Sequence, residues 1–237
     1  MSFFRKDTSW VNKVIFPAPR SSYNPDTFDA FKETVKLFWV PRRNAAVRRP
    51  AESAYDENSV PCIWLPCPAP GARYILIYCH GNSEDLGQNA YMLSKLRDYL
   101  KVHVLGIEYP GYGISVGQPS EAGINNDLLV VYSFLTGVMK WPSQDILLYG
   151  FSIGTGPTTH LAAHQPVGGL VLLAPYTSIR DMVSEVLPKG VGKVAQFLIS
   201  NRFENQKEIA KVKCPTLIIH GRSDELIPHT HSESLIE

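Results

Sequence analysis

The amino-acid sequence predicts one α/β domain built on a mostly parallel sheet, and three observations support this. From about Pro61 onward, apolar strand-like runs alternate with segments of helical periodicity, which is typical of parallel strands joined by right-handed crossovers. Most of these runs are continuously apolar, as expected for strands covered on both faces. The length of 237 residues and the hydrophobic content of 44% suit a single domain with a sizeable core.

The predicted strands are short and apolar, and each helix candidate lies between two of them. The strands are expected at Cys62–Leu65, Tyr74–Cys79, Val102–Ile107, Ile146–Tyr149, Leu170–Ala174 and Thr216–Ile219. The helices are expected at Leu93–Leu100, Ile124–Leu135, Thr158–His164 and Met182–Ile199, and the first should have one apolar face made of Met92, Leu96, Tyr99 and Leu100. Upstream, Val35–Val40 and Cys62–Leu65 flank a long polar connection and are interpreted as a leading antiparallel pair.

Charge and cysteine content limit the compartment and the partners. The net charge of +1 predicts no nucleic-acid partner, although residues 1–50 carry ten Lys/Arg against four Asp/Glu, a net of +6. The densest basic stretch contains Arg42, Arg43, Arg48 and Arg49. Four irregularly spaced cysteines fit a reducing, cytoplasmic compartment better than a disulfide framework or a zinc site. We expect no metal site and no cofactor. We find neither a signal peptide nor an apolar run long enough to span a membrane.

The first residues differ in composition from the rest of the chain. Phe3, Phe4 and Trp10 are mixed with basic residues before a proline-rich stretch. One interpretation is a short amphipathic helix in peripheral contact with the cytoplasmic face of a membrane. The other is an N-terminal arm packed on the domain. We assign residues 1–32 to this arm and residues 33–237 to the domain.

Two Gly-x-Ser-x-Gly matches offer a candidate nucleophile, and their contexts differ. Ser152, in Gly150-Phe151-Ser152-Ile153-Gly154, follows an apolar strand and precedes a segment that can start a helix. A nucleophile elbow requires this strand–turn–helix context, with small residues where the backbone is crowded. Ser115 lies between turn-forming residues on both sides, so we interpret it as structural.

Acyl-transfer chemistry also needs donors for an oxyanion and an acid that orients a base. The backbone N–H groups of Ile153 and Asn82 are the expected oxyanion donors, since Asn82 follows the strand that ends at Cys79. Asp224, on the loop after Thr216–Ile219, is the expected acid. Asp181 is a poorer candidate, because its position favours a helix N-terminal charge.

Taken together, the stretches PGARYILIYCHGNSEDLGQ, EYPGYGISVGQPSE, ILLYGFSIGTGPT and CPTLIIHGRSDELIP resemble the α/β-hydrolase fold. More narrowly, they resemble the α/β-hydrolase-domain 17 family of serine hydrolases, which remove palmitate from protein cysteines. The resemblance implies Ser152 as nucleophile, Asp224 as acid, and Asn82 with Ile153 at the oxyanion hole. It also implies S-acylated proteins as substrates. A short insertion at about 175–213 would leave the site fairly open.

The chain departs from this family in two places. No cysteine precedes Cys62, whereas the family carries an N-terminal cysteine cluster that is itself palmitoylated. The family's catalytic histidine follows one more helix and one more strand, and the chain ends where that helix should begin. We therefore expect a domain that lacks its last helix, last strand and histidine loop, with doubtful activity of its own.

No histidine of the chain is well placed to act as the base. His229 and His231 have the right chain order, but they lie too close to Asp224 to reach the elbow easily. Three functions stay open: a palmitoyl-protein thioesterase, a more general carboxylesterase or serine peptidase, and a non-catalytic binding module of the same fold.

Overall fold

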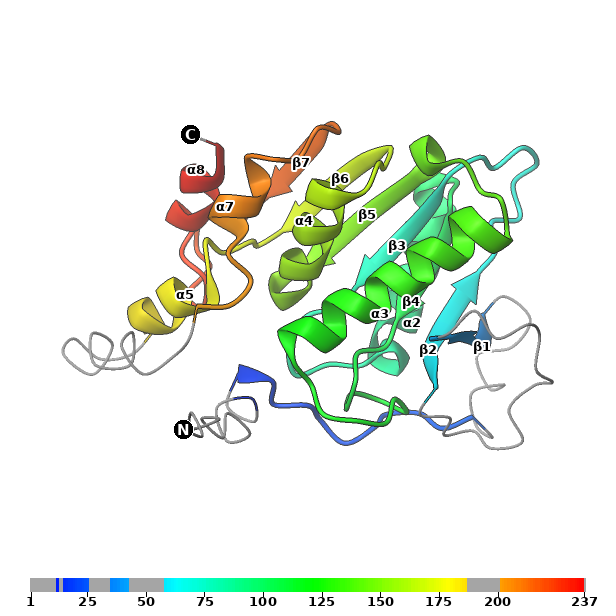
Figure 1. Ribbon diagram of the computed structural model, residues 1–237, viewed down its shortest axis with the longest axis horizontal. Coiled ribbons are helices and arrows are strands. Elements are labelled where there is room, and N and C mark those ends of the chain that lie inside the picture. Colours follow the sequence, from blue (N-terminus) through cyan, green and yellow to red (C-terminus); the bar gives the residue numbers. More distant parts are fainter. Residues whose placement is uncertain (1–11, 13–14, 26–34, 43–57, 187–200, 237) are drawn as a thin grey trace, which may run out of the picture.

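The computed structural model describes residues 12, 15–25, 35–42, 58–186 and 201–236, and centres on one sheet (Figure 1). Its seven strands lie in the order β1-β2-β4-β3-β5-β6-β7. β1 pairs antiparallel with β2, and β2 pairs antiparallel with β4, while every other pairing is parallel. The strands are β1 (Lys36–Pro41), β2 (Ser59–Leu65), β3 (Ile75–Cys79), β4 (His103–Ile107), β5 (Ile146–Phe151), β6 (Gly169–Leu173) and β7 (Thr216–Ile219).

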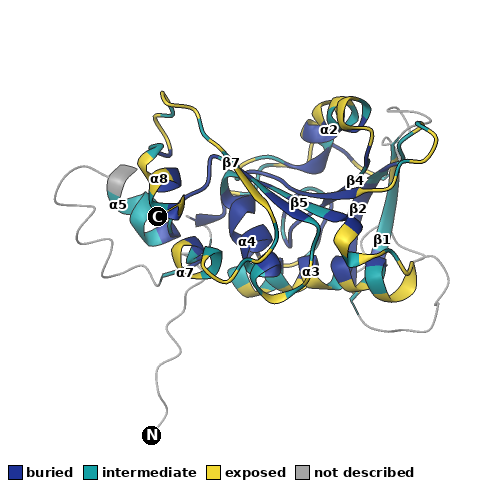
Figure 2. Ribbon diagram, turned by 90° about the horizontal axis from the view of Figure 1, so that it is seen from above, coloured by how far each residue is buried: buried dark blue, intermediate teal, exposed yellow. Residues whose placement is uncertain are grey.

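Helices cover both faces of the sheet. Figure 2 shows α2 on one side of the strands, and α3, α4 and α7 on the other. The helices are α2 (Leu86–Leu100), α3 (Glu121–Ser133), which continues as a π-helix (Phe134–Val138), α4 (Thr155–His164), α5 (Ile179–Val186), α7 (Asn205–Ile209) and α8 (Thr230–Ile236). Short 3-10 helices lie at Ser143–Asp145 and Ser152–Gly154. The predicted fold class, with its leading antiparallel pair, is therefore confirmed.

Strand β3 shows why the central runs are continuously apolar. Ile75 and Ile77 belong to the core cluster that includes α3 and α4, whereas Leu76 and Tyr78 belong to the cluster that includes α2. Successive side chains of a strand point to opposite faces, so a strand between two helical layers needs apolar residues at every position. All five residues of β3 are buried.

The prediction for the first helix was wrong in both its start and its buried face. α2 begins at Leu86, where the Asp85 side chain caps it by accepting from the N–H of Gln88. The helix buries Leu86, Ala90 and Leu93, which are spaced three and four residues apart. Of the predicted apolar face, Leu96 alone packs on the core, as a partly buried residue, whereas Tyr99 is 81% exposed and Met92 and Leu100 are exposed as well.

The described part of the N-terminal region packs on the domain. Ile15, Phe16 and Tyr23 are buried in its core. Arg42, from the basic stretch, forms an ion pair with the buried Asp127 at 2.7 Å. Phe3, Phe4, Trp10, Arg43, Arg48, Arg49 and the end of the fourth predicted helix lie outside the described residues. No helix in the described part of the chain has the length and apolar composition that crossing a membrane requires. The proposed limits of arm, domain and insertion stay predictions.

Strand β7 forms one edge of the described sheet, and two of its apolar side chains face solvent. Leu217 is 55% exposed and Ile219 is 43% exposed. Because exposed apolar edge strands pair with other chains, we expect Leu217→Lys to slow self-association, measured by light scattering at rising protein concentration. Val138→Lys is the matched control, since Val138 is 64% exposed but lies in the π-helix. Equal aggregation of the two variants would contradict this role of β7.

Candidate active site

Ser152 lies on a sharp turn between β5 and α4. Its backbone φ is 51°, in the left-handed region that residues with a side chain rarely adopt. The 3-10 helix Ser152–Gly154 leads directly into α4. This is the strand–turn–helix backbone of a nucleophile elbow, which presents the serine at the carboxyl edge of a parallel sheet.

The two glycines of the motif are required by close packing. A Cβ on Gly154 would lie 2.8 Å from the carbonyl oxygen of His80 and would also overlap the backbone of Cys79. A Cβ on Gly150 would lie 2.5 Å from the carbonyl oxygen of Gly154. Neither glycine has a positive φ, so both serve close packing: Gly154 lets the elbow lie against the end of β3, and Gly150 lets the start of α4 fold back over β5.

The Asn82 loop lies beside the elbow, because β3 and β5 are neighbouring parallel strands that end at the same edge. The Asn82 side chain is held on both sides: its amide donates to the carbonyl oxygen of Ile15 at 2.7 Å, and the Tyr112 hydroxyl donates to its oxygen at 2.6 Å. These bonds fix the loop and leave the backbone N–H of Asn82 as the predicted oxyanion donor. The other predicted donor, Ile153, follows Ser152 at the start of the 3-10 helix.

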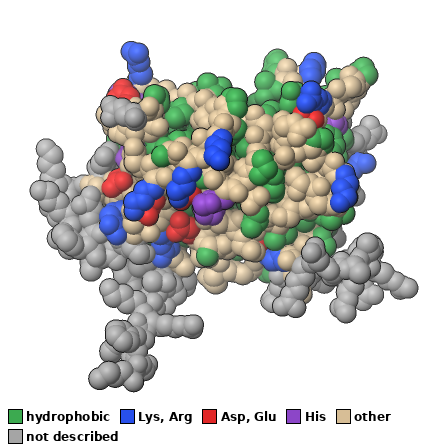
Figure 3. Space-filling view, turned by 45° about the horizontal axis from the view of Figure 1, so that its top comes forward, with side chains coloured by type: hydrophobic (Ala, Val, Ile, Leu, Met, Phe, Trp, Pro, Cys, Tyr) green, Lys and Arg blue, Asp and Glu red, His purple; other side chains and the backbone are tan. Residues whose placement is uncertain are grey.

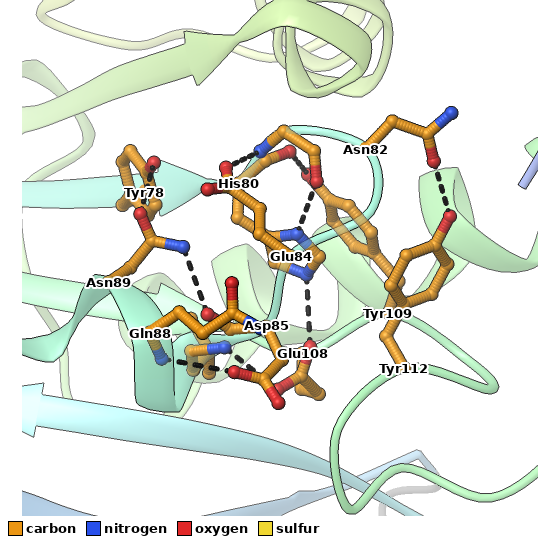
Figure 4. A network of polar contacts seen from close by, with 12 residues as sticks. Tyr78, His80, Asn82, Glu84, Asp85, Gln88, Asn89, Glu108, Tyr109 and Tyr112 are labelled. Carbon is orange, nitrogen blue, oxygen red and sulfur yellow. Dashed lines mark hydrogen bonds and ion pairs between the residues drawn. The ribbon is translucent and has the colours of Figure 1, made fainter. Parts of the chain in front are cut away.

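A buried polar network supports this loop from below (Figure 4). His80 and Glu108 are both fully buried, and His80 Nε2 lies 3.0 Å from Glu108 Oε1. The other ring nitrogen of His80 lies 2.8 Å from the carbonyl oxygen of Gly81, and the Tyr109 hydroxyl donates to the carbonyl oxygen of His80 at 2.7 Å. The loop backbone is therefore restrained at successive residues just before Asn82.

The same network connects the N-terminal segment with α2. The Tyr23 hydroxyl donates to Glu108 Oε2 at 2.7 Å, and the N–H of Leu86 donates to the same oxygen at 3.1 Å. The Ser22 N–H donates to the Asp85 carboxylate at 2.6 Å. We did not single out Glu108 or Tyr23 from the sequence. The available signal was a charged residue directly after the apolar strand that ends at Ile107.

Burial and charge act in opposite directions on His80. Burial alone would lower the pKa of the ring, but the Glu108 carboxylate, the carbonyl oxygen of Gly81 and the Glu84 carboxylate together outweigh this cost, so the pKa of His80 is raised. The protonated form of His80 is thereby favoured beside the carboxylate, as a buried charge requires a partner.

Asp224 follows β7, with β6 between it and the elbow strand β5. One carboxylate oxygen accepts from the backbone N–H groups of Leu226 and Ile227, both at 2.9 Å. The other lies 3.7 Å from Nε2 of His220. Two backbone donors stabilise a carboxylate and fix its orientation. The catalytic roles of Asp224, Ser152, Asn82 and Ile153 stay predictions.

No histidine in the described part of the chain forms a hydrogen bond with the Ser152 hydroxyl. The His231 ring accepts from the N–H of Thr177 at 3.3 Å, and His229 lies 3.5 Å from Glu233 on α8. His220 is held by Ser232 and by the carbonyl oxygen of Ile227. The other four are His80, His103 in β4, and His160 and His164 on α4. The structure thus brings the elbow and the Asn82 loop together at one sheet edge, and among its described residues no histidine is bonded to the serine.

Asp181 and Ser115, the two poorer candidates from the sequence, form local hydrogen bonds. The Asp181 carboxylate, in the first turn of α5, accepts from the hydroxyl groups of Ser178 at 2.6 Å and Thr177 at 2.9 Å. Ser115 lies in a turn, where its N–H donates to the carbonyl oxygen of Tyr112.

The sheet order, the crossover helices and the serine elbow define the α/β-hydrolase fold. The structure of an α/β hydrolase from Vibrio vulnificus superimposes with a TM-score of 0.75, and the match covers 98% of this chain and 81% of that protein. The two sequences are 15% identical, so this likeness shows the fold alone. No protein-family model matches the chain.

Sequence relatives identify the family. The α/β-hydrolase domain-containing protein aho-3 of Caenorhabditis elegans is 31% identical over 240 residues, which cover 97% of this chain and 68% of that protein. The mouse α/β-hydrolase domain-containing protein 17C is 32% identical over 181 residues, which cover 76% of this chain and 54% of that protein. The chain therefore belongs to the family of α/β-hydrolase domain-containing proteins.

The left-handed backbone of Ser152 gives the first prediction for the site. Ser152→Gly should be more stable than Ser152→Ala by about 1 kcal/mol, because glycine has no steric cost at positive φ. Urea unfolding of both variants measures the difference. Ser133, at φ −65 in a helix, is the matched control, where glycine should instead be less stable than alanine by about 1 kcal/mol. The same order of stability at both positions would argue against a strained elbow.

The raised pKa of His80 gives the second prediction. Since its folded pKa lies above the unfolded value of about 6.5, its contribution to stability is complete below that pH and is lost as the pH rises through the folded pKa. Glu108→Gln should lower the free energy of unfolding by about 3 kcal/mol at pH 6. It should also flatten the pH dependence of this free energy above about pH 6.5, measured by urea unfolding at a series of pH values.

Glu233→Gln is the matched control, since Glu233 on α8 is exposed and its partner His229, which directly precedes α8, is half-exposed. This variant should change neither the stability nor its pH dependence. An unchanged slope in Glu108→Gln would contradict the role assigned to the buried pair.

Proposed function

We propose that this chain is the hydrolase domain of a serine enzyme that cleaves long-chain acyl thioesters of proteins, with Ser152 as nucleophile. The observation that carries the proposal is the left-handed backbone of Ser152 between β5 and α4, beside the Asn82 loop. Membership of the α/β-hydrolase family supports hydrolase chemistry. The motif resemblance to protein depalmitoylases supports the thioester substrate.

The proposed reaction has two acyl-transfer steps. The Ser152 oxygen attacks the thioester carbonyl, the C–S bond breaks, and the cysteine sulfur leaves with the proton removed from the serine. Water then attacks the acyl-serine ester, which releases the fatty acid and restores the hydroxyl. In both steps the backbone N–H groups of Ile153 and Asn82 would stabilise the negative oxygen of the tetrahedral intermediate.

Asp224 would orient the imidazole that carries the proton between these steps. Its two backbone donors, the N–H groups of Leu226 and Ile227, fix the orientation of the carboxylate. The imidazole is the component for which no described histidine qualifies. We therefore expect the 237-residue chain to be slow, because loss of the base in a catalytic triad costs about 10⁶ in kcat.

The proposed substrate also suggests where the enzyme works. Protein S-acyl groups insert into membranes, and we propose that the aromatic and basic residues at the start of the chain bring the domain to the cytoplasmic face. The backbone described from Ile15 onward packs on the domain, so this contact would involve the residues that precede it.

A fluorophosphonate probe tests the nucleophile. We expect slow labelling of the chain that becomes faster with added imidazole, because an external base can replace the missing one. Ser152→Ala should abolish labelling, whereas Ser115→Ala, at the other Gly-x-Ser-x-Gly match, should label like the original chain. Absence of labelling even with imidazole would contradict the proposal and favour a non-catalytic binding module.

Comparison of kcat/KM on three substrates tests the specificity under the same imidazole conditions. A palmitoyl-thioester peptide should be hydrolysed faster than an acetyl ester or an aminoacyl amide. Faster hydrolysis of the amide would identify a peptidase. Faster hydrolysis of the acetyl ester would identify a general esterase.

A further inference from the structure

Helix α4 carries two histidines on the face that meets α7. His160 and His164 are one turn apart, so their rings lie side by side, with centroids 4.6 Å apart. Glu208 of α7 approaches both rings: its Oε2 lies 3.7 Å from His160 Nδ1 and 2.9 Å from His164 Nε2. The three potential ligand atoms all lie within 4.8 Å of one another. In Figure 3, histidine side chains lie at the surface beside acidic and basic ones.

This spacing is close to that of a four-coordinate metal site. Zinc bonds to histidine nitrogen and carboxylate oxygen measure about 2.0–2.2 Å, so ligand atoms around a tetrahedral ion lie about 3.4 Å apart. The two distances from Glu208 Oε2 fall on either side of that value. Small rotations of the half-exposed His160 and His164 side chains would bring all three atoms to the required separation.

The state of the three groups also suits a metal ion. Glu208 Oε2 is buried and has no hydrogen bond among the described residues, although it faces two rings. The His160 and His164 side chains are 43% and 46% exposed, so an ion can reach the cluster from solvent. Glu208 Oε1 is occupied separately, by the ammonium group of Lys211 at 2.9 Å.

We propose that His160, His164 and Glu208 bind one zinc ion at the interface of α4 and α7, with water in the fourth position. Two imidazole nitrogens favour zinc over magnesium or calcium, which prefer oxygen ligands. The site is separate from the serine site, and the proposal does not depend on hydrolase activity.

The ion would attach α7 to the helix that follows the nucleophile elbow. At the N-terminal end of α7, Asn205 donates to the Thr155 hydroxyl at 3.2 Å, and that hydroxyl donates to the carbonyl oxygen of Ser152 at 2.7 Å. A metal on His160, His164 and Glu208 would fix the same interface further along both helices. Zinc binding should therefore stabilise the elbow region as one unit with α7.

Calorimetric titration of the untagged protein with zinc at pH 7.5 tests the proposal. The background carries Cys67→Ser and Cys214→Ser, because these two thiols are partly accessible. We expect one ion per chain and a rise in Tm of about 5 °C at saturating zinc. His164→Gln and Glu208→Gln should each weaken binding by at least about tenfold, since each removes one of three ligands.

Two further variants separate a metal site from a salt-bridge cluster. Lys211→Gln should tighten zinc binding, because it removes the cation that competes for Glu208, and misfolding cannot produce a gain of affinity. His229→Gln is the matched control: it also removes one imidazole beside a glutamate, Glu233, and should leave the affinity unchanged. Absence of stoichiometric binding, or equal affinity of His164→Gln and the parent protein, would overturn the proposal.

Discussion

The buried carboxylate of Glu108 is the group on which the organisation of the sheet edge depends. It has no access to water, so its charge must be neutralised by protein groups. The partners come from three different segments: His80 from the loop after β3, Leu86 from the start of α2, and Tyr23 from the N-terminal segment. Removal of any one partner leaves part of a buried charge unsatisfied, which ties the position of each segment to the others.

This constraint reaches the candidate active site through the loop backbone. His80 is held by Glu108 and Tyr109, and Asn82 follows it after a single glycine. A backbone donor can stabilise an oxyanion only if it is already in place, since reorientation during the reaction would cost free energy. The buried pair, together with the stacking of the His80 ring on Tyr109, therefore fixes the geometry of the loop that carries Asn82.

The elbow and the layered sheet could be predicted from the sequence because their causes are local. Continuously apolar runs require cover on both faces, and the glycines beside Ser152 mark a crowded turn. Asp85 followed three residues later by Gln88 was also a local helix-start signal, although we overlooked it. The buried face of α2 was predicted wrongly because Tyr99 and Met92 are apolar but exposed, which is common at protein surfaces.

The polar contacts could not be predicted from the sequence, because each depends on segments that are far apart in the chain. Nothing near Glu108 identifies Tyr23 as its partner, and nothing near His160 identifies Glu208. The contacts of Asp224 with Leu226 and Ile227 are local, but their value to a carboxylate depends on the turn that the backbone adopts there. Such contacts follow from the fold and become visible only once it is known.

The long sequence separation between the N-terminal segment and its hydrogen-bond partners also has a consequence for synthesis on the ribosome. Tyr23 and Ser22 leave the ribosome early, but their partners Glu108 and Asp85 lie 85 and 63 residues further along the chain. The N-terminal segment therefore lacks these hydrogen bonds while β2, β3, α2 and β4 are synthesised, and it can pack on the domain only after those elements assemble. During that interval its apolar residues Ile15 and Phe16 remain available to chaperones, although they end in the core.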